Sequence, residues 1–474
     1  MSNPAEPHLG ASPAQSPSTA TPATAPPAAT QPADPPPPGD LLADLQWRGL
    51  IAHTTDIDAL AEDLAAGPLT IYCGFDPTAP SLHVGNLVPL LTLRRFQLAG
   101  HRPIGLVGGA TGLIGDPSGR SSERSLNDEA VVAAWLGAIR QQLREVLEFH
   151  GPAAASVVSN YDWVQHLSAI DLLREVGKHF SVNQMLAKES VHARLTGEGI
   201  SYTEFSYMVI QAYDFVELYR RRGCTMQIGG SDQWGNITAG LDLIRKMEGR
   251  GGPRPHALTV PLVTKADGTK FGKTAGGAIW LSPELTSPYA FYQFWINTDD
   301  RDVSQMLRLF SLRPPVEIAE LLAEHEVRPA ARAAQRALAH EITALLHGEA
   351  AAVAAAEASK ALFGRGDIAV LDEPTLTAAL TEAGHFDVAD AQIEVVEMLV
   401  GAKLCASKSA ARRSIAEGGC YVNNVRVSDP EAVFSGADAL AGGWLLVRRG
   451  KRAIAGVRFQ NPPDLRRYGQ VGRI

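Results

Sequence analysis

The sequence predicts an α/β fold in which a parallel sheet with helices on both faces is followed by an α-helical unit and a small α+β unit. From residue 69 to residue 248, short apolar runs alternate with segments of helical spacing, which is typical of alternating strands and helices. Residues 300–365 are rich in Ala, Leu and Glu at helical spacing and contain no convincing strand. Beyond Gln392, two short helical patterns precede strand patterns that are separated by Asn and Gly turns.

The first strands and helices are predicted from the residues at their ends. LTIYCGF and RPIGLVGG are predicted as strands, and the apolar-faced helix between them is expected to stop at Gly100. Asn127 is predicted to cap a helix that runs to His150, because the acidic residues after it suit the positive end of a helix.

The second part of the alternation repeats this order. Ser201 and Glu204 match a capping box before a long helix that is expected to end at Arg222. TMQIGG is then predicted as a strand and ITAGLDLIRKME as a helix. Ligands in parallel sheets of this kind bind at the carboxyl ends of the strands, so we expect the functional residues in the loops that follow the strands.

Composition places the chain among ordinary soluble proteins. No apolar run approaches the roughly 18–20 residues that a membrane-spanning helix needs. The 4 cysteines are scattered without a CxxC pair, which argues against zinc and disulfides and is typical of a reducing cytosol. Residues 1–40 are rich in Pro, Ala, Ser and Thr without Lys or Arg, so we expect a disordered leader and no targeting peptide. The expected location is therefore cytoplasmic.

One candidate phosphate site lies in the segment Pro77–Asn86, where a strand and turn lead into a helix. The N-terminus of a helix attracts phosphate, and Thr78 and Ser81, just upstream of His83, could supply hydroxyl donors there. Gly85 is expected to let a backbone or a flat base approach closely. A His beside a Gly at a helix start is more often a simple cap, so this segment is weak by itself.

A second candidate phosphate site is the segment Lys270–Thr274 (KFGKT), which follows a hairpin turn at Asp267-Gly268. Gly272 is expected to make this loop mobile, so that Lys270 and Lys273 can reach a transferring phosphate. A solvated surface loop is an equally good interpretation of this segment alone. Two arginines after the glycine-rich loop at residues 115–119 could add positive charge, namely Arg120 and Arg124.

Polar residues follow several of the predicted strands or share one helix face, and their convergence could hold an amino acid by its ammonium group and polar side chain. Each one alone is more often a satisfied core residue. They are Tyr72, Asp76, Asp116, Tyr207, Gln211, Asp214, Asp232 and Gln233.

The chain resembles bacterial tyrosyl-tRNA synthetases in five ordered segments: YCGFDPTAPSLHVGN, LVGGATGLIGDPSG, FSYMVIQAYDF, QIGGSDQWGN and LVTKADGTKFGKT. The resemblance implies a Rossmann-like class I catalytic domain at 41–299, an α-helical anticodon-side domain at 300–385 and an RNA-binding domain of the ribosomal S-four type at 392–459, after the leader at 1–40. It also implies tyrosine–tRNA ligation, in which L-tyrosine is activated with ATP and its Mg²⁺ and then passed to tRNA(Tyr). A homodimer without a protein-bound metal follows from the same resemblance.

The family pattern assigns roles to the candidate residues. The phenolic hydroxyl of tyrosine would be held by Tyr72 and Asp214, its ammonium group by Asp116, Tyr207 and Gln211, and its carboxylate by Gln233. The residues that stabilise the transferring phosphates would be Thr78, His83, Arg120, Arg124, Lys270 and Lys273. ATP would be bound by Asp76, His83, Gly85, Asn86, Gly230, Asp232, Lys270, Lys273 and Thr274. Asn86 replaces the second histidine of the family motif, and its amide could still donate to a ribose or bridging oxygen.

The C-terminal part of the chain is basic. Residues 401–474 contain 13 Lys plus Arg and 5 Asp plus Glu, a net charge of +8, which leaves −16 for the first 400 residues. Lys408, Arg412 and Arg413 fall on one predicted helix, and four further basic residues lie between 448 and 452. A solvated tail would explain the charge alone, but helical spacing together with the resemblance indicates RNA binding.

Two other classes of function remain open at this point. The chain could be an RNA-binding or regulatory paralogue whose catalytic domain is only a scaffold. It could also be a duplicate synthetase that serves a tyrosine analogue or confers inhibitor resistance. The paired lysines and the Tyr72–Asp214 pair count against the first of these.

Overall fold

A six-stranded sheet carries the first half of the chain in this computed structural model, which describes residues 34–118, 127–195, 199–249, 251–269, 271–274 and 277–460. The strand order is β1-β6-β5-β2-β3-β4. The five parallel strands are β2 Thr70–Phe75, β3 Arg102–Val107, β4 Ser156–Ser159, β5 Cys224–Gly230 and β6 His256–Val260. β1 His53–Thr54 pairs antiparallel with β6 at one edge. The predicted parallel sheet is confirmed, and the predicted leader lies outside the described residues up to residue 33.

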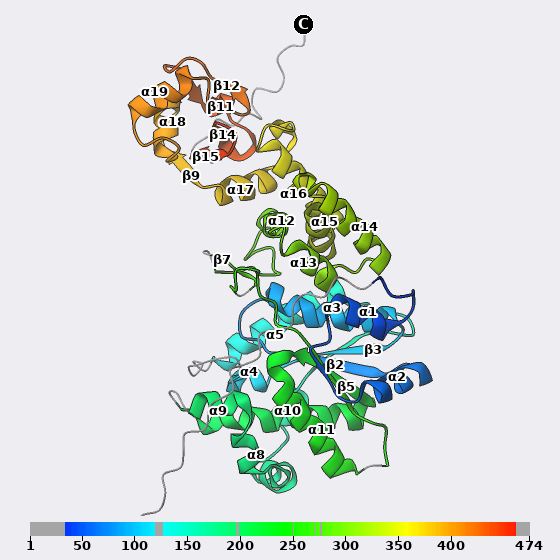
Figure 1. The fold of residues 1–474 in the computed structure, drawn as a ribbon. Coiled ribbons are helices and arrows are strands. Elements are labelled where there is room, and N and C mark those ends of the chain that lie inside the picture. Colours follow the sequence, from blue (N-terminus) through cyan, green and yellow to red (C-terminus); the bar gives the residue numbers. More distant parts are fainter. Residues whose placement is uncertain are drawn as a thin grey trace, which may run out of the picture. The chain divides into compact units, whose positions relative to one another are not determined.

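The strand order reverses between β2 and β5, so the loops after these two strands flank the switch point of the sheet. Two helices cover one face, α3 Val84–Leu98 and α5 Glu129–Val146. Two others cover the opposite face, α10 Tyr202–Arg222 and α11 Trp234–Glu248 (Figure 1). The buried apolar residues accordingly form a separate cluster on each face.

The ends of these helices follow from local chemistry. The Ser201 side chain accepts a hydrogen bond from the Glu204 backbone N–H, which confirms the predicted N-cap of α10. The predicted cap at Asn127 is wrong: Asp128 is the N-cap of α5, because its carboxylate accepts from the Ala130 backbone N–H. The helix also ends at Val146 rather than His150, since Leu147 already has extended backbone angles.

Shorter elements complete this part of the chain. They are α1 Leu41–Arg48, α2 Ile57–Ala66, α4 Thr111–Ile114, α6 Tyr161–Val164, α7 Ala169–Asp171, α8 Val182–Leu186, α9 Glu189–Leu195 and the two-residue strands β7 Lys273–Thr274 and β8 Gly277–Ala278. None of the helices in the described part of the chain has the length and apolarity that a bilayer span requires.

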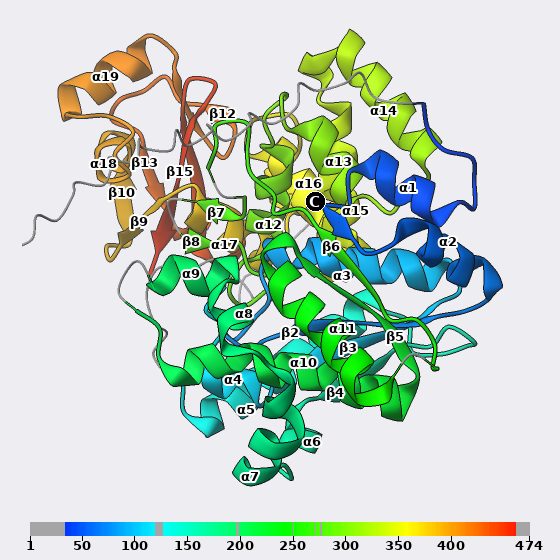
Figure 2. The same ribbon diagram turned by 60° about the horizontal axis from the view of Figure 1, so that its bottom comes forward.

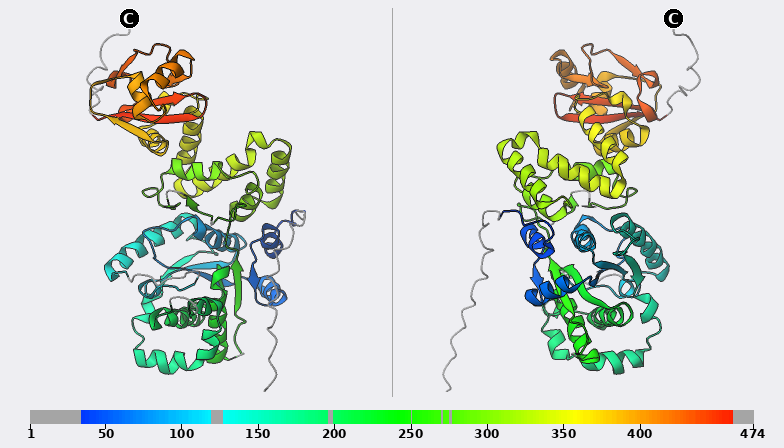
Figure 3. Two further views of the ribbon diagram at one scale, coloured as in Figure 1. Left: turned by 60° about the vertical axis from the view of Figure 1, so that its left-hand side comes forward. Right: turned by 90° about the vertical axis from the view of Figure 1, so that its right-hand side faces the viewer.

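Helices and connecting turns make up the described chain from residue 300 to residue 384, as predicted (Figure 3). The helices are α13 Val303–Phe310, α14 Pro315–Val327, α15 Ala333–His347, α16 Glu349–Ala361 and α17 Glu373–Glu382. The preceding helix α12 Pro288–Ile296 packs against α15 and α16. The proposed domain boundary near residue 300 stays a prediction.

The C-terminal part is a five-stranded sheet of order β12-β11-β14-β15-β9 with helices α18 Val395–Gly401 and α19 Lys408–Ala416 packed beside it (Figure 2). Its strands are β9 His385–Val388, β11 Cys420–Val422, β12 Val425–Arg426, β14 Trp444–Arg449 and β15 Ala453–Phe459, and β10 Gln392–Glu394 pairs separately with β13 Val433–Ser435. Asn423 and Asn424, with φ of 47° and 65°, make the predicted turn between β11 and β12. Because β9 joins β15, this sheet begins before Gln392.

Candidate active site

The helix start predicted as a phosphate site is held together by its own residues. His83 is the N-cap of α3: its Nδ1 accepts from the Gly85 backbone N–H at 3.0 Å, and its own N–H donates to Asn86 Oδ1 at 3.1 Å. Because Nδ1 is an acceptor, the neutral ring carries its proton on Nε2. A Cβ atom on Gly85 would lie 2.8 Å from His83 Cε1, so the close approach expected at Gly85 is made by the histidine ring itself.

The structure brings the two predicted phosphate segments side by side. The Val84 N–H donates to the Ile279 carbonyl at 3.0 Å, and the Ile279 N–H donates to the Gly272 carbonyl at 3.0 Å. Gly272 has a φ of +79°, and a Cβ atom there would lie 2.5 Å from Val84 Cγ2. The expected turn at Asp267-Gly268 is present. Lys270 lies outside the described residues, and for Lys273 and Thr274 only the backbone is described.

A chain of hydrogen bonds connects the ends of β2, β3 and β4 to α10. Asp76 accepts from Tyr207 Oη and from Thr111 Oγ1, each at 2.7 Å. Asn160 Nδ2 donates to Thr111 Oγ1 and to Asp214 Oδ2, each at 3.0 Å. Three of the predicted residues therefore belong to one network at the carboxyl ends of the strands.

Asp214 is the most deeply buried acid of this network. Its second oxygen accepts from the indole N–H of Trp163 at 2.8 Å. Burial raises its pKa to about 8, while the donors Asn160 and Trp163 lower the pKa and the nearby Asp76 raises it further. Burial, and after it the charge of Asp214, raises the pKa of Tyr72 well above its ordinary value.

Two buried polar atoms at this site have no hydrogen-bond partner among the described residues, Tyr72 Oη and Gln211 Oε1. Buried polar groups are almost always paired, and unpaired ones therefore indicate where a polar ligand binds. Gln211 belongs to the same helix, α10, as Asp214, whose charge adds to the effect of burial in raising the pKa of Tyr72. A polar ligand at this end of the sheet could therefore satisfy both atoms.

A second set of polar contacts links the loops after β3 and β5. Gln233 Nε2 donates to Asp116 Oδ2 at 2.7 Å. Burial and the Asp116 charge raise the pKa of Asp232. A Cβ atom on Gly230 would lie 2.5 Å from Asp232 Oδ1, so only glycine leaves room for this carboxylate. Thr78 is exposed on the loop after β2. Arg120 and Arg124 lie outside the described residues.

Three members of the network are not predicted from the sequence: Thr111, Asn160 and Trp163. Each follows a strand of the sheet, as the predicted residues do, and this position was the available signal. Their partners are far away in sequence, however, and ordinary Thr, Asn and Trp residues carry no mark of such a role.

Comparison with known protein families shows to which family this chain belongs. Residues 64–364 match the model for class I tRNA synthetases of the W and Y type, and residues 376–455 match the C-terminal domain of tyrosine–tRNA ligases. A tyrosine–tRNA ligase from Streptomyces avermitilis is 59% identical over 419 residues, covering 88% of this chain and 98% of that protein. The chain belongs to the tyrosine–tRNA ligase family.

Other members of the tyrosine–tRNA ligase family agree with this. The enzyme of Thermobifida fusca is 59% identical over 428 residues, covering 88% of this chain and 99% of that protein. The crystal structure of a truncated mitochondrial tyrosyl-tRNA synthetase from Aspergillus nidulans is 31% identical, with a TM-score of 0.62, and covers 68% of this chain and 94% of that one. The resemblance and the class I fold inferred from the sequence are therefore confirmed.

The basic residues predicted to bind RNA lie on α19 of the C-terminal ligase domain. Lys408, Arg412 and Arg413 are all exposed, at the i, i+4 and i+5 positions of the helix. Lys408 Nζ pairs with Glu397 at 2.7 Å and Arg412 with Glu431 at 3.6 Å. Exposed ion pairs of this kind are weak, so both cations remain available to a polyanion.

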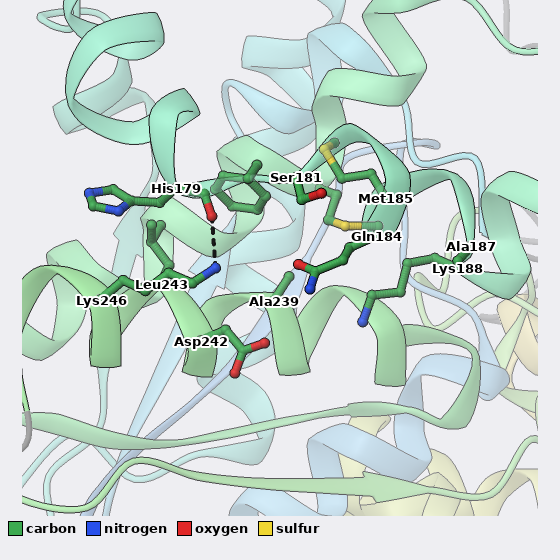
Figure 4. A pocket seen from close by; sticks show the side chains of 12 residues that line it. His179, Ser181, Gln184, Met185, Ala187, Lys188, Ala239, Asp242, Leu243 and Lys246 are labelled. Carbon is green, nitrogen blue, oxygen red and sulfur yellow. Dashed lines mark hydrogen bonds between the residues drawn. The ribbon is translucent and has the colours of Figure 1, made fainter.

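A hollow of about 390 Å³ lies apart from the polar network, between α8 and the outer side of α11 (Figure 4). It is lined by Met185, Met208 and Leu243, with two lysines at its sides. Lys246 Nζ donates to the His179 carbonyl at 2.8 Å and Lys188 Nζ to Thr238 Oγ1 at 3.3 Å. None of the residues predicted for the ligase site lines this hollow, so the polar network is the better candidate for the chemistry.

The described residues contain no group of three or more His, Cys, Asp or Glu side chains able to hold a metal ion. The four cysteines, all within the described ranges, are buried and free.

Proposed function

We propose that this chain activates L-tyrosine with ATP and transfers it to the 3′ end of tRNA(Tyr). In the first step a carboxylate oxygen of tyrosine attacks the α-phosphorus of ATP, and pyrophosphate leaves. In the second, a ribose hydroxyl of the tRNA attacks the carbonyl carbon of the adenylate, and AMP leaves. Neither step needs a protein nucleophile, so the protein contributes positioning and electrostatic stabilisation. Mg²⁺ enters with ATP as part of that substrate.

The observation that carries this proposal is the buried, unpartnered hydroxyl of Tyr72, together with the buried carboxyl group of Asp214. A phenolic hydroxyl would satisfy the unpartnered Tyr72 Oη and hydrogen-bond the carboxyl group, which can accept as a carboxylate or donate as an acid. A phenyl ring offers neither hydrogen bond, so phenylalanine would leave the Tyr72 hydroxyl buried and unpaired and would give Asp214 no partner on the ligand. This is the form of discrimination for which the family is already a standard example.

The ammonium group of tyrosine would meet a set of oriented acceptors. Tyr207 donates its only hydroxyl proton to Asp76, so its oxygen has only acceptor capacity left for a ligand. Gln211 Oε1 is a buried acceptor on the same helix, and Asp116 supplies a carboxylate. Gln233 would lie near the tyrosine carboxylate, since its amide already reaches the Asp116 side of the site. Asp76 would act here by orienting Tyr207, beside the ATP contact that the family pattern assigns to it.

ATP would lie over the start of α3. His83 presents its protonated Nε2 from an exposed cap position, and Thr78 is exposed on the loop before it. Lys270, Lys273, Arg120 and Arg124 would neutralise the leaving pyrophosphate, Asp232 would contact the ribose, and Gly85, Asn86, Gly230 and Thr274 would complete the nucleotide site. These roles remain proposals.

A homodimer in the cytoplasm is part of the same proposal. Large apolar side chains are exposed between residues 170 and 202, which is unusual for a surface in contact only with water: Ile170, Leu173, Val182, Leu195 and Tyr202. A second copy of the chain is the occupant we propose for them. The molar mass in solution would measure this.

ATP–pyrophosphate exchange with tyrosine and with phenylalanine tests the central claim. We expect exchange that depends on tyrosine and a much lower rate with phenylalanine. Asp214→Ala should lower the tyrosine rate by about 10- to 100-fold, the range expected when the buried partner of a polar group is removed, and change the phenylalanine rate little. Asp242→Ala, an exposed carboxylate on α11, serves as the control. A wild type without tyrosine-dependent exchange that still binds tRNA would favour the RNA-binding paralogue instead.

A further inference from the structure

Phe271, between the two lysines of the KFGKT segment, points into an aromatic cluster. Its ring centroid lies 5.1 Å from that of Phe294, 5.6 Å from that of Trp295 and 5.3 Å from that of Phe310. Phe294 and Trp295 belong to α12 and Phe310 to α13, and the last two are fully buried. The Phe271 N–H also donates to the Val263 carbonyl at 3.2 Å. One side of the lysine segment is therefore fixed to the helices.

The other side of the segment is fixed to the helix start that carries His83. Gly272, the next residue, touches Val84 closely and accepts from the Ile279 N–H, and Ile279 accepts from the Val84 N–H. The Trp280 ring lies 6.3 Å from the His83 ring, and the Leu281 N–H donates to the Leu82 carbonyl at 2.8 Å. Phe271 thus lies where the aromatic cluster meets the contact between the two phosphate segments.

We propose that Phe271 is a positioning residue for the activation step: its ring, held in the aromatic cluster, keeps the backbone of Gly272 and Lys273 beside the helix start that carries His83. This inference rests on the proposed function. Close packing of the ring among buried neighbours limits how far the backbone of Phe271 can move, and Gly272 and Lys273 follow it directly in the chain. Cations act on a transition state only when they are held in place, and a misplacement of about 1 Å can cost about 100-fold in rate.

The tyrosine site should not be affected by a substitution at Phe271. Its residues come from β2, α10 and the loops after the strands, and none of the ring contacts of Phe271 involves them. A change at Phe271 should therefore lower the rate of activation and raise KM for ATP, while the Kd for tyrosine stays within about twofold. General loss of structure would change all three quantities.

Phe271→Ala is the test, and Phe291→Ala is the matched control. Phe291 is fully buried in the same region and contacts Trp295 at 6.1 Å and His347 at 5.0 Å, with no ring contact to Phe271. We expect Phe271→Ala to slow adenylate formation by about 10- to 100-fold. Phe291→Ala should lower Tm at least as much, because it empties a fully buried position, and leave the rate within about threefold. Phe271→Leu keeps most of the apolar volume and should recover most of the rate.

The outcomes separate this inference from the proposed function. An active wild type whose rate is unchanged in Phe271→Ala would overturn the inference alone. Equal rate losses in the Phe271 and Phe291 variants, or a loss of tyrosine binding in Phe271→Ala, would overturn it as well. If Phe271→Ala does not fold, Phe271→Val, which also removes the ring, is compared in the same way, and an unchanged rate in it would overturn the inference. A wild type that shows no exchange with tyrosine would overturn both.

Discussion

Asp214 is a buried carboxyl group among the residues proposed to bind tyrosine, and burial raises its pKa to about 8. Two donors, Asn160 and Trp163, fix both of its oxygens, so the carboxyl group cannot rotate away from the neighbouring Tyr72. The cost of this placement is a carboxyl group that ionises with difficulty. A buried group held in this way is useful for discrimination because a substrate without a matching polar atom displaces water from it and offers no hydrogen bond in return.

The pH dependence of stability should reveal this cost. Because the pKa of Asp214 rises from 3.8 to about 8 on folding, the folded state keeps a proton that the unfolded state has lost. Stability is therefore highest below pH 4 as far as this group is concerned, and it falls as the pH rises toward 8, by up to about 1.4 kcal/mol per pH unit. Asp214→Asn cannot ionise, so it should lose stability to a missing acceptor but not show this fall.

Thermal unfolding of both proteins from pH 5 to pH 8.5 measures the effect. The Tm difference, variant minus wild type, should increase steadily with pH in this window. An Asp242→Asn variant, at an exposed position, should show a constant difference. A Tm difference for Asp214→Asn that stays flat or declines with pH would mean that Asp214 is ionised in the folded protein.

At the scale of elements, the contact between the start of α3 and the lysine segment depends on one glycine. Gly272 and Gly268 both have a φ of +79°, so alanine should be strained at either position by about 1–2 kcal/mol. Only at Gly272 would the added Cβ also meet Val84, at 2.5 Å, whereas nothing lies within 4 Å at Gly268. A comparison of alanine variants at these two glycines therefore separates the effect of backbone strain from the effect of the fit between the lysine segment and the start of α3.

Gly272→Ala should slow adenylate formation about 10-fold or more, because Val84 forces the lysine segment away from His83. Gly268→Ala should lower Tm by a similar amount and leave the rate within about twofold. Single-turnover measurements of both variants provide the comparison. Similar rates in the two variants would show that the fit of Gly272 against Val84 does not set the rate.

The same elements show how far the sequence could predict the structure. Apolar spacing identified β2, α3, β3, β5 and α10 because each buries one face in a cluster on one side of the sheet. The start of α5 was placed one residue early because Asn127 and Asp128 can both cap a helix, and only the backbone decides which does. Asn160 and Trp163 were missed because their role is a contact with Asp214, which is more than 50 residues away.

Across the whole chain, charge is divided between a catalytic part and a basic C-terminal part. The last 74 residues carry +8 and the preceding 400 carry −16. The acidic part contains every residue proposed for activation, a reaction of small molecules, whereas the exposed cations of α19 lie in the part that matches the ligase C-terminal domain. If this division reflects function, the two steps of the reaction should respond differently to the loss of charge in α19.

Replacing Lys408, Arg412 and Arg413 together by alanine should leave tyrosine-dependent pyrophosphate exchange unchanged, because no tRNA takes part in it. The Kd for tRNA should rise, and its logarithmic dependence on salt concentration should weaken by up to about 2–3, since each phosphate contact contributes about 0.7–0.9. Arg140→Ala with Arg144→Ala, an i, i+4 pair of exposed arginines on α5, is the control and should change neither quantity. A triple variant with an unaltered salt slope would mean that α19 does not touch the RNA and that its charge only solvates the helix.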